Sequence, residues 1–380
     1  MAFKWKWTNL AVAAAMGMMA STAAAAEHAS IQTEHVDAPV LESTGFDVVP
    51  VSDGGWIVTG SKDRQFTLQK FTQQGNLLWE TAFYPGLVGK AIIETTDGGY
   101  LAGGQTFYQS DEVGVQAFLI KVDKDGNMEW LQEVGDKAFD SITSIAELTD
   151  GYVLSGSLFE ANTTKSALVH IDKQGQNIQF VALSSYFPAN EAFVSSTLAT
   201  NDGGILITNR QEKALPDAGV QVSTKLVKLN AAFQKQWELM LPGDVLSGKV
   251  LPDGAIYAAR GISGNLNLTR VDATGKITWT RTHASGSTQY YEINGYDIAA
   301  SPDGGFVIAG ALSSTSSQTG YLLKVDASGN KLWDQTLYSN NSWIQGIASN
   351  GSNQFAVTGH VHLLGTPVPK LFFTLLQTNR

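Results

Sequence analysis

A short turn signature recurs along most of this chain, about every 50 residues, and it restricts the fold more than any other feature. Its first copy reads V-S-D-G-G-W from Val51, and a degenerate last copy, S-N-G-S-N-Q-F, starts at Ser349. The six clear copies share an aspartate followed by glycine, and these are Asp53, Asp97, Asp150, Asp202, Asp253 and Asp303. Seven similar units of this length indicate a repeat architecture, in which each unit buries its apolar face against the next.

A second line follows each turn signature, as in V-D-A-T-G-K-I-T-W. Five copies of this line end in tryptophan, at Trp79, Trp130, Trp237, Trp279 and Trp333, and the third copy ends in Phe180. Apolar residues alternate with period two between the signatures, which is typical of strands. We therefore predict an all-β, seven-bladed β-propeller of four-stranded antiparallel blades, with each tryptophan packed against the neighbouring blade.

The two ends of the repeat region predict how the ring closes. The last copy stops after its third strand, L-F-F-T-L-L-Q, and a spare extended segment, residues 29–35, precedes the first copy. Because an unpaired sheet edge is exposed to unwanted pairing, we expect this N-terminal segment to complete the last blade as its outer strand.

The N-terminus has the composition of a secretory leader. Lys4 and Lys6 precede a short apolar run, and small residues lead up to Glu27. We expect residues 1–26 to be a signal peptide and residues 27–380 to be a single propeller domain, periplasmic or extracellular, soluble and without a membrane span. The chain contains no cysteine, so a disulfide framework and an acylated cysteine are excluded.

The charge balance is acidic. The whole chain has 25 basic and 35 acidic residues and a net charge of −10. Such a chain repels phosphate backbones, so we expect no nucleic-acid partner. We expect the mature protein to be a monomer.

The stretch K-V-D-K-D-G-N-M-E-W from Lys121 to Trp130 has two interpretations. Asp123, Asp125 and Asn127 alternate as in a calcium loop, but the same residues suit a tight hairpin. In the other copies the position of Asp125 is taken by Gln74, Gln174, Ala232, Thr274 and Ser328. The turn is kept while the oxygen ligands change, which favours the hairpin, and calcium stays as the alternative. We expect no other cofactor.

These paired lines resemble the repeats of secreted bacterial β-propeller proteins of the D-G-G-Y kind. The line V-D-A-T-G-K-I-T-W is also similar to the repeat of quinoprotein-like (PQQ-type) propellers, which include a periplasmic scaffold for outer-membrane assembly. The resemblance covers residues 40–380 and implies the propeller fold. It does not imply quinone enzymology, because the quinoprotein dehydrogenases have eight blades and adjacent cysteines over the cofactor.

Aromatic residues are the main candidates for a binding surface. The connections between blades and those between second and third strands should share one face, together with the long insertions 106–116 and 211–223. That face should carry Phe83, Tyr84, Phe139, Tyr186, Phe187, Tyr290, Tyr291, Tyr338 and Trp343. Exposed rings with polar neighbours suit a protein or glycan partner, although the same rings can instead fill blade junctions.

Three residues align at the end of the second strand of their blades: Arg210, Arg260 and His360. Two arginines in adjacent blades suit an anionic ligand, or they pair with acids such as Glu212 or Asp217. His360 and His362 have a spacing that suits a transition metal, but a third ligand is not evident.

The sequence therefore favours an exported binding or scaffold propeller that recognises a protein or glycan through its aromatic loops. The alternative is a hydrolase or lyase acting on an anionic sugar or small molecule at the channel mouth. In that alternative Arg210 and Arg260 clamp the substrate and His360 is the acid or base. No G-x-S-x-G, H-E-x-x-H or P-loop motif occurs in the sequence.

Overall fold

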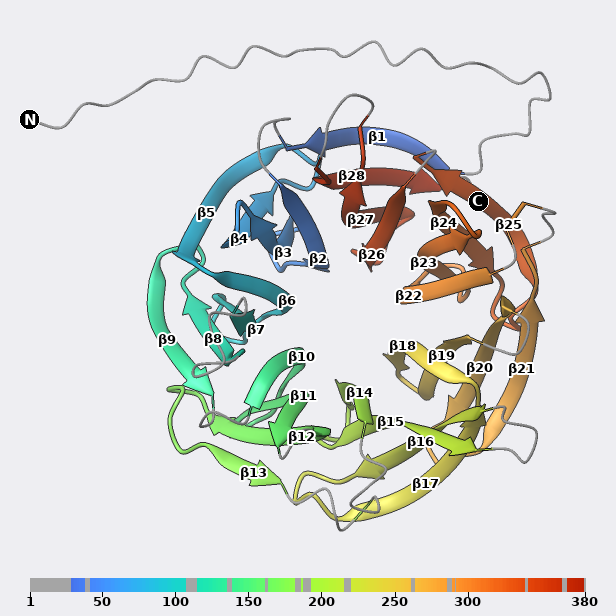
Figure 1. Cartoon of the computed structure of the whole chain (residues 1–380), viewed down its shortest axis with the longest axis horizontal. Coiled ribbons are helices and arrows are strands. Elements are labelled where there is room, and N and C mark those ends of the chain that lie inside the picture. Colours follow the sequence, from blue (N-terminus) through green and yellow to red (C-terminus); the bar gives the residue numbers. More distant parts are fainter. Residues whose placement is uncertain are drawn as a thin grey trace, which may run out of the picture.

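The computed structural model of the chain is a ring of seven four-stranded antiparallel sheets, a seven-bladed β-propeller (Figure 1). The predicted fold class and blade number are confirmed. The structure describes residues 29–37, 42–106, 115–134, 139–160, 163–181, 186, 193–214, 220–260, 264–285, 289–290, 292–338, 341–363 and 368–378. The expected leader at residues 1–26 lies outside these ranges. The described residues include no helix of the length and apolarity needed to cross a bilayer.

The blades follow one another along the chain, and each runs from the ring axis outward. Blade 1 contains β2 (Ser43–Pro50), β3 (Trp56–Lys62), β4 (Gln65–Phe71) and β5 (Leu77–Pro85). Blade 2 contains β6 (Leu87–Glu94), β7 (Tyr100–Thr106), β8 (Ala117–Val122) and β9 (Met128–Val134). Blade 3 contains β10 (Phe139–Glu147), β11 (Gly151–Glu160), β12 (Thr163–Asp172) and β13 (Gln179–Val181).

The second half of the ring repeats this order. Blade 4 contains β14 (Phe193–Ala199), β15 (Ile205–Ala214), β16 (Val220–Leu229) and β17 (Lys235–Pro242). Blade 5 contains β18 (Asp244–Leu251), β19 (Gly254–Arg260), β20 (Leu266–Asp272) and β21 (Ile277–His283). Blade 6 contains β22 (Glu292–Ala300), β23 (Phe306–Ser313), β24 (Gln318–Val325) and β25 (Lys331–Leu337). Blade 7 contains β26 (Ser342–Ser349), β27 (Gln354–Val361), β28 (Lys370–Thr378) and β1 (Ala29–Val36).

The N-terminal strand closes the ring as predicted. β1 pairs antiparallel with β28, from Ala29 opposite Thr378 to Val36 opposite Phe372. The side chain of Gln335 on β25 also bonds both the amide nitrogen and the carbonyl oxygen of Ala29, at 3.1 Å each. The first strand therefore pairs with the last one and contacts the blade before it, which leaves β28 without a free edge.

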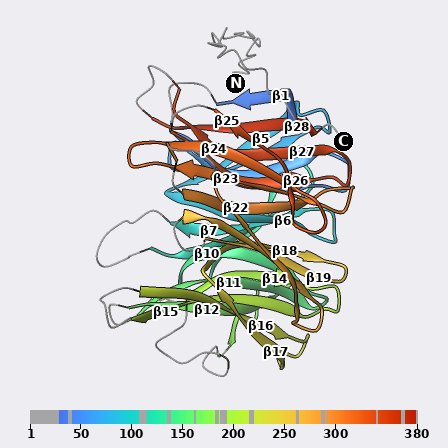
Figure 2. The ribbon, with the colours of Figure 1, turned by 90° about the vertical axis from the view of Figure 1, so that its right-hand side faces the viewer.

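Burial distinguishes the middle strands of each blade from the outer ones. Every residue of β8 is buried, whereas in β9 half-buried side chains alternate with exposed ones along most of the strand. The middle strands are covered on both faces by neighbouring blades, so they consist of nearly continuous apolar runs. Seen from the side, the strands of the blades form a compact stack with loops at their ends (Figure 2).

The tryptophans of the repeat pack between blades, as predicted. Trp79 of blade 1 lies against Gly126 of blade 2, where a Cβ would come within 3.0 Å of the indole ring. Gly126 also has a φ of 83°, which favours glycine in this hairpin turn. The same relation joins three further pairs: Trp130 with Gly175, Trp237 with Gly275, and Trp279 with Gly329.

The junction between blades 3 and 4 uses the opposite arrangement. Phe180 replaces the tryptophan and is 50% exposed. Phe233 replaces the glycine, adopts a φ of 57°, and packs edge-on against His170 with ring centroids 6.0 Å apart. The large ring thus comes from the following blade, and the backbone accepts a conformation that is strained for phenylalanine.

Candidate functional site

The two ends of the strands form two different faces of the ring. We call the end that carries the D-G-G turns and the hairpins between third and fourth strands the turn face. The opposite end, with the connections between blades and between second and third strands, is the loop face. The antiparallel order of every sheet produces this division.

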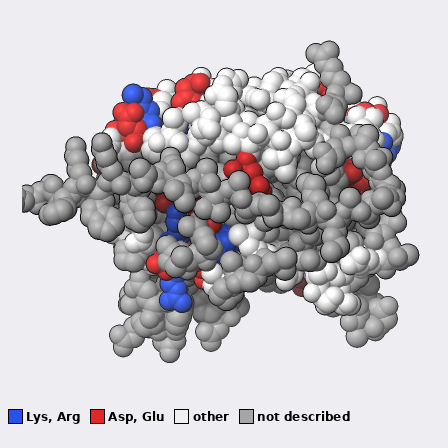
Figure 3. All heavy atoms as spheres, turned by 90° about the horizontal axis from the view of Figure 1, so that it is seen from above, with Lys and Arg blue, Asp and Glu red and all other residues white. Residues whose placement is uncertain are grey.

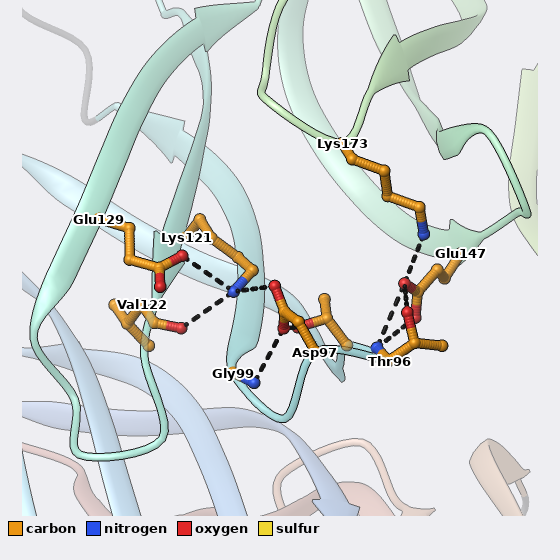
Figure 4. Close-up of polar contacts among 9 residues, drawn as sticks. Thr96, Asp97, Gly99, Lys121, Val122, Glu129, Glu147 and Lys173 are labelled. Atoms are coloured by element: carbon orange, nitrogen blue, oxygen red, sulfur yellow. Dashed lines mark hydrogen bonds and ion pairs between the residues drawn. The ribbon is translucent and has the colours of Figure 1, made fainter.

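On the turn face, the aspartate of blade 2 is held by a buried lysine (Figure 4). The Nζ of Lys121, whose residue is 2% exposed, lies 3.0 Å from Asp97 Oδ2 and 3.1 Å from Glu129 Oε2. The backbone N–H of Gly99 donates to Asp97 Oδ1 at 3.0 Å. Burial opposes ionisation of Asp97, but the hydrogen bonds from Thr95, Gly99 and Lys121 outweigh it and lower its pKa to about 2.

The same pairing of a basic side chain with the turn aspartate occurs in six blades. The basic residue comes from the third strand, two residues before the first polar residue of the hairpin turn. The other pairs are Lys70 with Asp53, His170 with Asp150, Lys228 with Asp202, Arg270 with Asp253, and Lys324 with Asp303. The sequence contains this signal, as in K-V-D at Lys121, but our sequence analysis did not use it.

Carboxylates also link neighbouring blades on this face. Glu147 of blade 3 accepts hydrogen bonds from the backbone N–H and the hydroxyl of Thr96 in blade 2, and from Lys173 (Figure 4). Glu94 of blade 2 accepts equivalent bonds from Ser52 of blade 1. The turn-face carboxylates are therefore engaged in holding turns and blades together.

The stretch from Lys121 to Trp130 is the predicted hairpin between β8 and β9. Asp123 Oδ1 accepts the backbone N–H groups of Asp125 and Asn127 at 2.9 Å each, and its Oδ2 accepts the side-chain amide of Asn127 at 2.9 Å. Asp125 lies 3.3 Å from Lys124. The Asp123 oxygens that a calcium loop would use as ligands thus accept hydrogen bonds from within the same turn. Within the described part of the chain no group of three or more His, Asp or Glu residues is placed to hold a metal ion.

Several predicted loop-face aromatics pack into blade junctions. Phe83 stacks on Phe66 at 5.2 Å. The hydroxyl of Tyr290 lies 3.0 Å from the Thr319 hydroxyl, and the Tyr186 hydroxyl donates to the Phe233 carbonyl. Tyr338 bonds Glu34 and Thr374 with its hydroxyl and packs on Phe372 at 4.7 Å. These rings take the junction-filling role that the sequence left open as an alternative. Tyr84, by contrast, is 50% exposed.

Blade 7 carries the main aromatic cluster of the described loop face. Trp343 on β26 stands opposite His360 on β27, and their ring centroids are 4.4 Å apart. His362 follows with its ring centroid 6.1 Å from that of His360. All three are half-buried. Burial and then the charge of His362 lower the pKa of His360 to about 4, so its imidazole is neutral at pH 7.

One of the two arginines, Arg210, reaches a carboxylate between blades 4 and 5. Arg210 Nε lies 3.3 Å from Asp244 Oδ2 at the start of β18, and its Nη1 contacts Glu212. Asp244 is the strand partner of Arg260. The Arg260 side chain and Asp217 lie outside the described residues, as do Tyr291, Phe187 and the side chain of Phe139. The expected insertion 211–223 is partly strand, because β15 continues to Ala214 and β16 begins at Val220.

The ring axis contains two carboxylates that sequence analysis missed. Each of the seven inner strands has a β-bulge, and Asp47 and Asp297 follow the bulge in blades 1 and 6. Asp47 accepts the Ile92 N–H of blade 2 at 3.0 Å, and Asp297 accepts the Ile347 N–H of blade 7 at 2.8 Å. Burial, and next the charge of Asp297, raise the pKa of Asp47 to about 7. Burial also raises the pKa of Asp297.

The outer rim shows mixed charge. In Figure 3 the coloured part of the rim has Asp and Glu beside Lys and Arg, with uncharged residues between them. Lys62 is also balanced by acids, because its Nζ lies 2.9 Å from Glu80 Oε1 and 3.4 Å from Asp37 Oδ1. Alternating signs of this kind do not form a single charged field that would attract a polyelectrolyte.

Comparisons with known proteins agree with the fold. No family model and no curated relative matches the sequence. A protein of unknown function from Dyadobacter fermentans DSM 18053 is similar in structure, with 9% identity, a TM-score of 0.50, and coverage of 93% of this chain and 100% of that one. Others are a protein of unknown function from Bacteroides caccae (14%, TM-score 0.39, coverage 67% and 94%) and Drosophila Plexin A in complex with Semaphorin 1b (7%, TM-score 0.49, coverage 91% and 87%). At these identities the first similarity supports the fold alone.

Proposed function

We propose that this protein is an exported binding propeller that recognises a protein or glycan partner through the Trp343, His360 and His362 cluster of blade 7. The observation that carries the proposal is the contact between the Trp343 and His360 rings, which are tilted by 38° with centroids 4.4 Å apart, on the loop face of a closed ring. An indole beside a neutral imidazole offers a partly exposed, weakly polar aromatic surface. Such surfaces suit the apolar face of a sugar ring or an aromatic side chain.

The rigidity of the ring supports this function. The cluster lies on paired strands, β26 and β27, and not on an isolated loop. Its blade is closed by β1, so the rings are already ordered before a partner arrives. A preorganised surface loses less conformational entropy on binding. Export is part of the same proposal and rests on the leader-like residues 1–26. The likeness to quinoprotein-like repeats fits such a scaffold role.

The enzyme alternative lacks support from Arg210. Arg210 is paired with both Glu212 and Asp244, so its charge is already compensated by two carboxylates. A substrate anion has to compete with both. Turnover of an anionic polysaccharide that is lost in Arg260→Gln would nevertheless favour the hydrolase or lyase.

Partner binding by single-ring variants tests the proposal. The purified protein is applied to a glycan array and, separately, used to capture proteins from the envelope and medium of its host. We expect either the glycan array or the protein capture to identify a ligand. The Kd for this ligand should rise about 30-fold in Trp343→Ala, which is the effect expected for a residue at the centre of an interface. Trp343→Phe, which keeps a ring, should lose less.

Leu332→Ala is the matched control because Leu332 is 54% exposed on β25, away from the cluster. Its Kd should stay within about twofold of wild type, since isolated surface substitutions have small effects. Thermal melts of each variant verify folding. If Trp343→Ala and Leu332→Ala bind every ligand equally, the blade 7 cluster is not the recognition site.

A further inference from the structure

One position of the repeat carries a much smaller residue in blade 5 than in the other six blades. The residue that follows the D-G-G turn and starts the second strand is buried in all seven blades. It is Trp56, Tyr100, Tyr152, Ile205, Ala255, Phe306 and Phe355 in chain order. Blade 5 thus has a methyl group where five blades have an aromatic ring.

A cavity of about 130 Å³ lies where that ring is missing, between blades 4 and 5 on the turn face. Its lining includes, from blade 4, Leu206, Lys228 and Trp237, and from blade 5, Val250 and Ala255. For comparison, an engineered apolar cavity of about 150 Å³ in another protein binds benzene. The space is therefore adequate for a single six-membered ring.

The junction between blades 1 and 2 shows what the repeat places there. The Tyr100 ring lies 6.2 Å from the Trp79 ring, and Lys70 Nζ lies 5.8 Å from its centroid. Burial, followed by the charges of Asp53 and Glu94, raises the pKa of the Tyr100 hydroxyl. The phenol ring is thus bordered by an indole and a cation, with carboxylates near its hydroxyl.

The empty junction keeps the same border. Trp237, Lys228 and Asp202 are the repeat counterparts of Trp79, Lys70 and Asp53, and all three line the cavity. Lys228 Nζ is held 2.9 Å from Asp202 Oδ1 and 2.9 Å from the Leu229 carbonyl, in the same way as the lysine of blade 2 in Figure 4.

The indole wall of the cavity is also fixed in place. Trp237 Nε1 donates to the Ala273 carbonyl at 3.0 Å. A Cβ on Gly275 would come within 2.7 Å of the indole ring, so the two are in close contact. The wall therefore cannot collapse into the space without losing these contacts.

We propose that the junction of blades 4 and 5 is a binding site for one small phenol, whose ring takes the place that Tyr100 has between blades 1 and 2. The ring lies against Trp237 and Lys228, and the hydroxyl donates to Asp202. The site is on the turn face and uses none of the blade 7 cluster, so it is independent of the proposed recognition surface.

Binding of phenol itself tests the site. Titration into the full chain, followed by intrinsic tryptophan fluorescence and by the shift in Tm, should saturate. Cyclohexanol has the same size but lacks the π system, and we expect its Kd to be about fivefold higher or more. Absence of saturable phenol binding, or equal binding of cyclohexanol, would overturn the proposal.

Filling the cavity from within provides the matched variants. Ala255→Tyr introduces the residue of blades 2 and 3, and Ala255→Ile that of blade 4. Each should raise the phenol Kd at least about tenfold while the melt stays cooperative. Ala255→Ile keeps the test valid if the larger ring does not fit. Unchanged phenol binding in a folded Ala255 variant contradicts the site.

Two controls locate the site and its source. Trp343→Ala should bind phenol like wild type, whereas loss of phenol binding in this variant would place the phenol on the loop face and overturn the proposal. N-acetyltyrosinamide carries the same ring on a peptide unit. If phenol binds and N-acetyltyrosinamide does not, the site takes free small phenols. If both compounds bind, the proposed site also accepts a tyrosine ring that is carried by a polypeptide.

Discussion

The turn face and the loop face are built by the same seven blades but hold their side chains in different ways. On the turn face, one basic side chain and one aspartate pair in six blades, from Lys70 with Asp53 to Lys324 with Asp303. Among the described loop-face residues, contacts such as Arg210 with Asp244 or Trp343 with His360 occur in one place each. Contacts that recur serve the architecture, and contacts that occur once are where recognition can be specific.

The largest expected effect comes from opening the ring, on which both faces depend. Deleting residues 29–37 removes β1 and exposes the edge of β28. We expect the free energy of unfolding to fall by about 5 kcal/mol or more, because a strand and its apolar contacts are lost. Urea unfolding measures this loss. Removal of residues 1–26 alone is the control and should leave stability unchanged, and equal stability of both truncations would contradict closure by β1.

A turn-face pair should show the next largest effect. Asp97→Ala leaves the buried Lys121 without one of its carboxylates. We expect a loss of about 2 kcal/mol, below the range of about 3–5 kcal/mol for a fully buried pair, because the Asp97 side chain is 59% exposed. Lys121→Met removes the buried charge itself and should cost less than about 1 kcal/mol. Denaturant midpoints of the two variants measure these losses. A larger loss in Lys121→Met than in Asp97→Ala would contradict the expectation.

Alanine substitutions at two glycines distinguish the cost of crowding between blades from the cost of backbone strain. Gly126 and Gly351 have φ values of 83° and 81°, but only a Cβ on Gly126 meets a neighbouring ring, that of Trp79 at 3.0 Å. Gly351→Ala should cost about 1 kcal/mol from strain, and Gly126→Ala about 1 kcal/mol more from crowding. Thermal melts measure the difference. Equal losses would mean that the indole shifts freely and adds nothing to the junction.

The carboxylates at the ring axis give a pH-dependent effect. The pKa of Asp47 is about 7 in the folded protein and 3.8 without the fold, so the folded state holds more protons between these values. Its contribution to stability is fully present below pH 4 and is lost as pH rises to 7. We expect Asp47→Asn to flatten the fall in Tm between pH 5 and pH 7.5. An unchanged profile would contradict the shift.

The smallest effect should come from the loop-face ion pair. Arg210→Gln removes two partly exposed contacts, with Glu212 and Asp244. We expect a change below about 1 kcal/mol in unfolding free energy, weaker at high salt. A loss as large as that of Asp97→Ala would remove the distinction between the two faces.

Local patterns along the chain predicted most of the architecture. Period-two alternation and D-G-G turns gave the strands, the blade number and the hairpin at Lys121, and the spare residues 29–35 indicated the closing strand. The packing of Trp79 against the next blade also followed from the repeat, whereas its contact with Gly126 came from the structure. By contrast, the lysine of the K-V-D line is visible in the sequence, but its pairing was not predicted. Its aspartate partner lies on the D-G-G turn, about 24 residues earlier in the chain.

The candidate sites depended on distances across the ring. Trp343 was predicted on the loop face, but its ring contact with His360 required the register of β26 and β27. Tyr290 and Tyr338 were in the same predicted group and are instead bonded to Thr319 and Glu34. A sequence pattern assigns a ring to a loop, whereas packing decides whether that ring faces a partner or a neighbouring blade.

By itself, the sequence determined the strands, their turns and the number of blades, because alternation and glycine preferences act over a few residues. Only the tertiary structure brought Asp47 and Asp297 together at the axis. It also showed that the small side chain of Ala255 leaves a cavity beside Trp237. Those relations join residues from different blades, and their geometry depends on how the twisted sheets pack once the ring has closed.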